Sequence, residues 1–227
     1  MKRELGFYFT SPIAYIVIVL FLIATGWSFF SVFFLHGRAD LRDFFSLLPL
    51  ILTFVIPAVT MRLFSEEFSG GSYEILLTFP VTTLDILMGK YLAATAFAVA
   101  MLVPTLSYPL FVDSLGELDW GPVLGGYLGT VFLVGQLCAV GLFASSLTKN
   151  QIVAFIVGIA ICVVLTQVDQ VLFLFPPFLA DVFQFIGTHA HFGTIGKGII
   201  DTRDLLYFIS MSFVALYFTN LVIENKR

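Results

Sequence analysis

The sequence predicts an all-α membrane protein, a single domain over 1–227 with six transmembrane helices. Of its 227 residues, 59% are hydrophobic and only 11% are charged, whereas soluble domains carry roughly 25% charged residues. The mean hydropathy of +1.01 is too high for a soluble fold of this length, which could not bury so much apolar surface. The apolar runs are continuous rather than alternating, which excludes membrane-spanning strands.

Six apolar runs are long enough for transmembrane helices, each of which needs about 20 residues. The predicted spans are 13–35, 44–64, 84–112, 122–147, 151–175 and 205–223. The first run is longer than the roughly 7–15 apolar residues of a signal peptide, so we expect it to remain as a span. Prolines inside the runs predict kinks; they are Pro49, Pro57, Pro104 and Pro109.

Acidic and hydroxyl residues mark the starts of three spans. The stretches DLRD at 40–43 and DTRD at 201–204 place acids at the cap and first turn of the second and sixth spans. The helix dipole favours negative charge there. Thr82 and Asp85 have the spacing of a capping box at the start of the third span.

Lysine and arginine in the short loops predict the orientation. With the N-terminus inside, the inner side carries Lys2, Arg3, Arg62, Lys90, Lys149, Lys226 and Arg227. The outer side carries Arg38, Arg42, Lys197 and Arg203. The excess on the inner side predicts that both termini are cytoplasmic.

The segment 65–83 is a polar connection between the second and third spans. Gly70-Gly71 predicts a turn, and Tyr73–Phe79 a short helix that ends before Pro80. The apolar face of this helix would consist of Ile75, Leu76 and Phe79. Because so short a helix is not stable alone in water, we expect it to dock on another surface.

Two surfaces could receive this short helix. It could rest among lipid headgroups, or it could fill a groove on a cytoplasmic partner. Glu66 and Glu67 favour the partner, because anionic headgroups repel carboxylates while an arginine of a partner could pair with them.

The stretch RLFSEEFSGGSYEILLTFPVTTLDILMGKYLA, 62–93, resembles the signature of ABC-2-type exporter permeases. The matching residues are Arg62, Glu66, Glu67, Gly70, Gly71, Glu74, Leu76, Leu77, Pro80, Val81, Gly89 and Lys90. Ser72 stands where threonine is common. The opening KRELGFYFTSPIAYIV and the late HFGTIGKGIIDTRDLLYFISMSFVALY are similar to the gliding-motility-associated branch of this family.

The resemblance implies an exporter-like permease subunit of the type V class in the bacterial inner membrane. It implies an amphipathic elbow helix at 1–12 and a cytoplasmic coupling helix within 65–83 that docks on an ABC ATPase. The implied coupling residues are Arg62, Glu66, Glu67, Gly70, Gly71, Glu74, Ile75, Leu76, Phe79 and Pro80. The chain itself would bind no cofactor and catalyse no reaction, because ATP and Mg²⁺ would sit on the partner.

The implied assembly contains two ATPase subunits and a second permease copy or homologue, with a possible extracytoplasmic auxiliary subunit. Its work would be export or force transmission. The alternative from the residues alone is a self-contained channel or secondary transporter, but that class favours inverted repeats, which the sequence does not display.

The fifth span has small and polar residues on one face: Gly158, Cys162, Thr166, Asp169 and Gln170. They could pack against helices of the same subunit, or they could form the dimer seam and translocation pathway, as the resemblance implies. Asp169 is either an acid at membrane depth, which needs a partner or water, or a charge in the outer loop.

Other features of the sequence are weaker. Gly121, Gly125 and Gly129 form a G-x-x-x-G repeat, which could serve packing within the subunit or a dimer contact. The outer segment 176–203 predicts a short re-entrant helix. Its two histidines have no third ligand at metal-binding spacing, and GTIGKG at 193–198 lacks the Walker pattern. Nothing indicates nucleic-acid binding, and Cys138 and Cys162 are expected to be packing residues.

Overall fold

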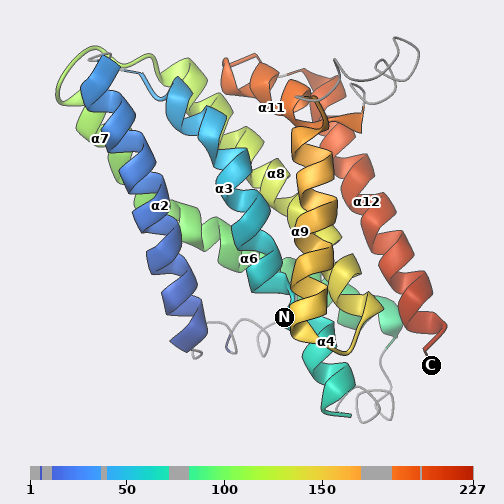
Figure 1. The fold of residues 1–227 in the computed structure, drawn as a ribbon. Coiled ribbons are helices and arrows are strands. Elements are labelled where there is room, and N and C mark those ends of the chain that lie inside the picture. The colour runs from blue at the N-terminus through green and yellow to red at the C-terminus, as the bar shows by residue number, and fades with distance from the viewer. Residues whose placement is uncertain are drawn as a thin grey trace.

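The computed structural model describes residues 6, 12–36, 40–71, 82–169, 186–199 and 201–226, and every element within them is helical (Figure 1). In chain order these elements are α2 (Pro12–His36), α3 (Arg42–Thr60), α4 (Arg62–Ser69), α6 (Thr83–Leu102), the 3₁₀ helix η1 (Val103–Leu106), α7 (Ser107–Asp113), α8 (Trp120–Leu147), α9 (Gln151–Gln167), α11 (Thr188–Gly196) and α12 (Thr202–Glu224).

Among the described residues, five helical stretches are long and apolar enough to cross a membrane. They are Ala14–Ser31, Arg42–Ser69, Thr83–Asp113, Trp120–Leu147 and Thr202–Glu224, and they correspond to five of the six predicted spans. For the predicted span 151–175, the structure describes an apolar helix of 17 residues, α9, which is about 26 Å long. The end of that predicted span, with Gln170, lies outside the described residues.

The helices run alternately between two ends of the bundle (Figure 1). We call one end the α4 end; it contains α4, the start of α6, the turn between α8 and α9, and the end of α12. We call the other the α11 end; it contains α11, α7 and the start of α12. The start of α2 and the end of α12 both lie at the α4 end.

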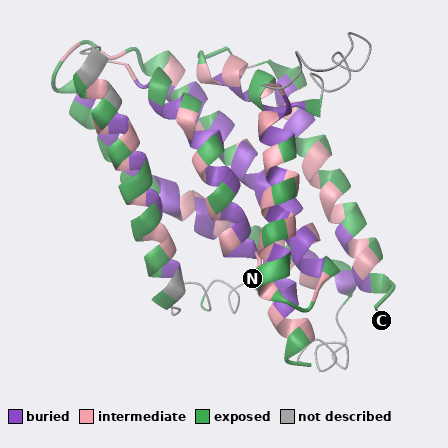
Figure 2. Ribbon diagram, viewed as in Figure 1, coloured by how far each residue is buried: buried purple, intermediate pink, exposed green. Residues whose placement is uncertain are grey.

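Helix α8 is the centre of the bundle and packs against α3, α4, α6, α9, α11 and α12. Its small residues allow this close approach: a β-carbon at Gly126 would lie 2.5 Å from the ring of Phe45 on α3. Buried residues gather on the inward sides of the helices, whereas α2 exposes much of its length (Figure 2). The exposed side chains of α2 include Tyr15, Ile16, Val19, Leu20, Ile23 and Trp27, which suits contact with lipid.

The predicted helix starts are confirmed at two of three spans. The capping box at α6 is present, with reciprocal hydrogen bonds between Thr82 and Asp85. Asp201 caps α12 by accepting from the backbone N–H of Arg203 at 2.9 Å. At the second span the prediction is confirmed for Asp43, which lies in the first turn of α3, but it is wrong for Asp40, because the cap position is Leu41, which provides no side-chain hydrogen bond.

The prolines differ in their effect. Pro104 lies in η1, where the third span changes from α to 3₁₀ geometry before α7. Pro49 and Pro57 lie inside α3, which continues through both of them to Thr60. The second span then resumes as α4 after a single residue, Met61.

The polar connection therefore begins later than the sequence predicted. The prediction placed its start at residue 65, but the helix α4 extends to Ser69. The glycine turn follows directly: Gly70 is the C-cap of α4, and Gly71 has a φ of 68°, which favours glycine.

The glycine repeat of α8 contacts α11 of the same chain. A β-carbon at Gly125 would lie 2.5 Å from the carbonyl oxygen of Ile195 and 3.0 Å from Cα of Gly198, and one at Gly129 would lie 3.0 Å from the Ile195 side chain. The repeat thus serves packing within the subunit at these two positions.

We predict that Gly125→Ala destabilises the protein by about 1–3 kcal/mol, because the new methyl group would meet backbone atoms that cannot move aside cheaply. Gly193→Ala on α11 is the control, since nothing lies within 4 Å of its β-carbon position. Thermal unfolding in detergent measures both variants. Equal unfolding temperatures for the two would contradict the described contact between α8 and α11.

Candidate functional site at the α4 end

The junction between α3 and α4 is held by one hydroxyl group of α8. Ser145 Oγ accepts hydrogen bonds from the backbone N–H groups of Phe64 (3.1 Å) and Ser65 (3.2 Å). It donates to the carbonyl oxygen of Met61 at 2.8 Å. The first N–H groups of a helix have no partner within the helix. Ser145 therefore supplies hydrogen-bond acceptors to the first turn of α4 and fixes it to α8.

A buried ion pair joins α4 to α6. Lys90 Nζ lies 2.6 Å from Glu67 Oε1, and the two side chains are only 3% and 20% exposed. The same ammonium group lies 5.4 Å from the ring centroid of Phe64. A charge this deep is tolerated only when it is paired, so the end of α4 and the second turn of α6 are bound to each other.

A second ion pair lies within α4. Arg62 bonds to Glu66 through both Nε (2.8 Å) and Nη2 (3.1 Å), one helical turn apart. The Glu66 side chain is 41% exposed, and a pair of this kind is worth about 0.3–0.5 kcal/mol. It supports the helix without burying its carboxylate.

Lys226, two residues after the end of α12, also contacts α4. Its ammonium group donates to the carbonyl oxygen of Ser146 at 2.6 Å and lies 4.5 Å from the ring centroid of Phe68. Burial lowers the pKa of Lys226, and the nearby Lys149 lowers it further. We call Glu67, Phe68, Lys90, Ser145 and Lys226 the α4 cluster.

The structure places five of the predicted coupling residues together on or beside α4. Arg62, Glu66 and Glu67 lie on the helix, and Gly70 and Gly71 form the turn that follows it. The others lie outside the described residues: Glu74, Ile75, Leu76, Phe79 and Pro80.

The observed pairing of the two glutamates differs from the one that the sequence suggested. We expected both to meet an arginine of a partner, but Glu67 is paired with Lys90 and Glu66 with Arg62 within the chain. Sequence reasoning missed the roles of Ser145 and Lys226. A lysine in an otherwise apolar helix was a signal for Lys90, whereas no local pattern marks the other two.

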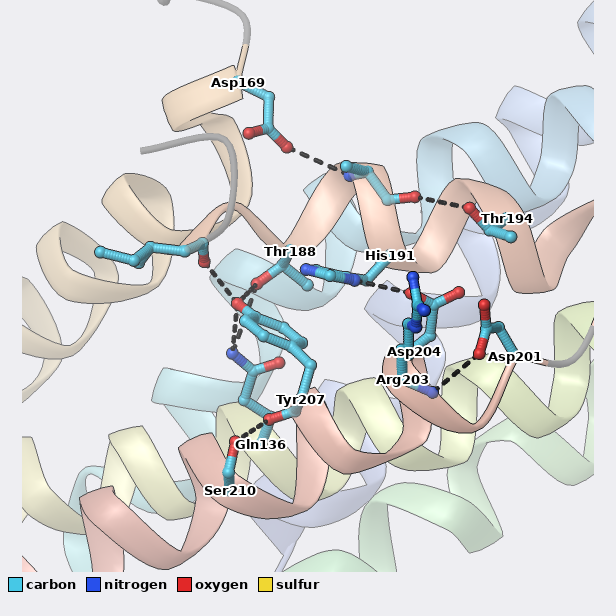
Figure 3. Close-up of polar contacts among 12 residues, drawn as sticks. Gln136, Asp169, Thr188, His191, Thr194, Asp201, Arg203, Asp204, Tyr207 and Ser210 are labelled. Atoms are coloured by element: carbon cyan, nitrogen blue, oxygen red, sulfur yellow. Dashed lines mark hydrogen bonds and ion pairs between the residues drawn. The ribbon is translucent and has the colours of Figure 1, made fainter. Parts of the chain in front are cut away.

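At the α11 end, Asp169 caps α11. Its Oδ2 accepts from the backbone N–H of Ala190 at 3.1 Å (Figure 3), where the helix dipole favours a negative charge. A β-carbon at Gly187 would collide with this carboxylate, so the glycine makes room for the cap. Asp169 therefore joins the end of α9 to α11.

Further polar contacts join α11 to α8 and α12 (Figure 3). Gln136 Nε2 donates to Thr188 Oγ1 at 3.3 Å and to the Tyr207 hydroxyl at 3.4 Å. His191 stacks on Tyr207 with ring centroids 4.2 Å apart, and its Nδ1 lies 2.7 Å from Asp204 Oδ1. In the part of the chain that the structure describes, no three metal-ligating side chains lie together.

The other residues of the predicted pathway face are packed inside the chain. A β-carbon at Gly158 would lie 3.1 Å from Cβ of Pro57, and Cys162 is buried. The hydroxyl groups of Thr166 and Thr53 lie 3.0 Å apart. This face of α9 packs against α3 and α8, so the structure describes the intrasubunit packing; a role in a dimer seam or pathway stays a prediction.

The model of a known family, the ABC-2 family transporter protein, matches residues 28–211. The chain belongs to the ABC-2 transporter family. The match covers most of the chain and includes α3, α4, Lys90 and Ser145, while Lys226 lies beyond it. A comparison with curated proteins gave no match.

This ABC-2 protein is therefore a multi-pass membrane protein of a permease family. Members are typically the non-catalytic membrane subunits of transporters and generally work with an ATPase partner. The α4 end, with its tightly held helix, is the candidate place for that partnership.

We predict that Glu67→Leu costs about 3–5 kcal/mol of unfolding free energy, because it leaves the buried charge of Lys90 without its carboxylate. The double variant Glu67→Leu/Lys90→Met should recover much of this loss, since the ammonium group is removed together with its carboxylate. Denaturant unfolding in detergent measures the cycle. Arg62→Gln, which removes a more exposed pair, serves as the control and should cost less than about 1 kcal/mol. If the losses of unfolding free energy caused by Glu67→Leu and by Lys90→Met alone add up to the loss in the double variant, the pairing is contradicted.

Proposed function

We propose that the chain is the permease subunit of an ABC-2 exporter that couples ATP hydrolysis in a separate subunit to export or to mechanical work across the membrane. The observation that carries the proposal is the anchored helix α4. It is the last part of a 28-residue helical stretch, Arg42–Ser69, and it is fixed to α6 by Lys90 and to α8 by Ser145.

The anchoring gives the connection 70–82 a mechanical role. The connection leaves α4 at Ser69 and enters α6 at Thr83, and the Glu67–Lys90 pair binds these two helices together. A displacement of the connection therefore moves α4 and α6 together, and it acts on α8 through the hydrogen bonds of Ser145. Nucleotide binding to the ATPase would shift the population of the permease between two such arrangements.

The residues of the connection would provide the surface for the ATPase. In the short helix that the sequence predicts there, Glu74, Ile75, Leu76, Phe79 and Pro80 would supply an acidic and apolar face that suits a groove on a protein. The Arg62–Glu66 pair would lie at the edge of this surface, since Glu66 keeps part of its carboxylate exposed. ATP and Mg²⁺ would bind to the partner alone.

In this assembly the α4 end faces the cytoplasm, with both termini on that side of the bacterial inner membrane. Support comes from the described basic residues Arg62, Lys90, Lys149 and Lys226, which gather at this end, as expected for cytoplasmic loops. Two permease copies, or one copy and a homologue, would bind two ATPase subunits. The likeness of the opening residues to the gliding-motility-associated branch supports force transmission to an extracytoplasmic subunit as the specialised role.

We predict that the tagged chain, purified from membranes of its own host, retains an ATP-binding subunit. Ile75→Asp/Phe79→Asp should abolish this retention, because carboxylates would have to enter an apolar groove. Leu115→Asp is the control, since Leu115 is exposed at the α11 end. Mass spectrometry of the purified complexes measures the retained subunit.

Two results would contradict the proposal. One is a wild-type chain that never retains an ATPase, which would favour a self-contained channel or secondary transporter. The other is an ATPase that is lost from the control variant and kept by the variant in the connection.

A further inference from the structure

Lys226 joins three helices that are far apart in the sequence. It lies two residues after the end of α12. Its ammonium group donates to the carbonyl oxygen of Ser146 near the end of α8 at 2.6 Å, and it lies 4.5 Å from the ring centroid of Phe68 on α4. The end of the last span is thus attached to the anchored helix of the coupling region.

The chemistry of this contact suits a lysine. The last carbonyl groups of a helix have no partner within the helix and carry partial negative charge, so the end of α8 attracts an ammonium group. The face of an aromatic ring attracts the same cation. Lys226 as a whole stays exposed, so the contact is made by an ammonium group at the edge of the bundle.

Helix α4 presents a pair of stacked rings to two lysines. The ring centroids of Phe64 and Phe68 are 5.9 Å apart, and each ring has its own cation: Lys90 of α6 for Phe64 and Lys226 for Phe68. Lys90 is also bound to Glu67. The helix is therefore held from α6 on one ring and from the end of α12 on the other.

The start of α12 lies at the opposite end of the bundle, where it contacts α11. Its 23 residues, Thr202–Glu224, span roughly 35 Å. Near its start, Asp204 pairs with His191 and Tyr207 bonds to Thr188, so α12 connects the α4 cluster at one end of the bundle with α11 at the other.

We propose that Lys226 is a positioning residue that passes movement of α4 to α12, and through α12 to α11 at the opposite end. The inference rests on the proposed function, because it takes the movement of α4 to be driven by a partner ATPase. It adds a second route to the one through α6. In this proposal the last span, α12, moves with α4 because Lys226 joins them, in addition to any movement that α12 shares through its packing along α8.

The test measures a distance at the α11 end while the ATPase is trapped at the α4 end. Spin labels are attached to cysteines at Leu124 of α8 and Leu206 of α12, both exposed, whereas the native Cys138 and Cys162 are buried. The complex retained from host membranes is placed in lipid nanodiscs. The distance between labels is measured by pulsed electron resonance with and without ATP and orthovanadate.

We expect the distance to change on trapping in the wild-type chain and in Lys226→Arg, which keeps the cation. In Lys226→Ala the change should be smaller by roughly two-fold or more, with the ATPase still retained, and Phe68→Leu should reduce it in the same direction. Lys149→Ala is the matched control, because Lys149 lies nearby but has no contact of this kind in the described structure. Retention of the ATPase by Lys226→Ala also shows that this variant is folded.

The outcomes separate the two proposals. If Lys226→Ala, with the ATPase bound, shows the same change of the label distance as the wild-type chain, the role of Lys226 is overturned and the proposed function stays intact. The role of Lys226 is also overturned if Lys226→Arg reduces the change of the label distance as much as Lys226→Ala does. A wild-type chain without a retained ATPase overturns the proposed function and this inference together.

Discussion

Glu67 and Lys90 meet at 2.6 Å where the lysine side chain has almost no contact with water, and much of the architecture at the α4 end depends on this pair. The two residues lie on opposite sides of the connection 70–82. Because a buried charge requires its partner, the end of α4 and the second turn of α6 cannot separate cheaply. A connection anchored in this way moves its two helices together when it is displaced.

Helix α8 is attached to the α4 cluster at one end and to α11 at the other. Its glycines bring α3 and α11 close, and its Ser145 hydroxyl satisfies the start of α4. With no hydrophobic driving force between helices in lipid, such close packing and hydrogen bonding determine which helices associate. The same helix therefore receives contacts from both ends, from α4 at one and from α11 at the other. This arrangement suits a permease whose two ends must respond together.

The sequence predicted what depends on local chemistry or on lipid. Spans follow from the length of apolar runs, and the capping box of Thr82 and Asp85 lies within four residues. It could not predict that Glu67 is paired internally, because its partner lies 23 residues away on another helix. Periodicity also identified the face of Gly158, Cys162 and Thr166, but not the neighbour of that face. Lys226 lies 80 residues from Ser146, and no pattern links them.

The central claim is that the ATPase binds at the α4 end, on the connection that follows Ser69. Its most direct test is photo-crosslinking in intact cells. A benzophenone amino acid is placed at Ser69, exposed at the end of α4, or at Leu115, exposed at the α11 end. The account predicts that Ser69 yields an adduct with an ATP-binding subunit and Leu115 does not. An adduct from Leu115, or none from Ser69 in a complex that retains the ATPase, would contradict it.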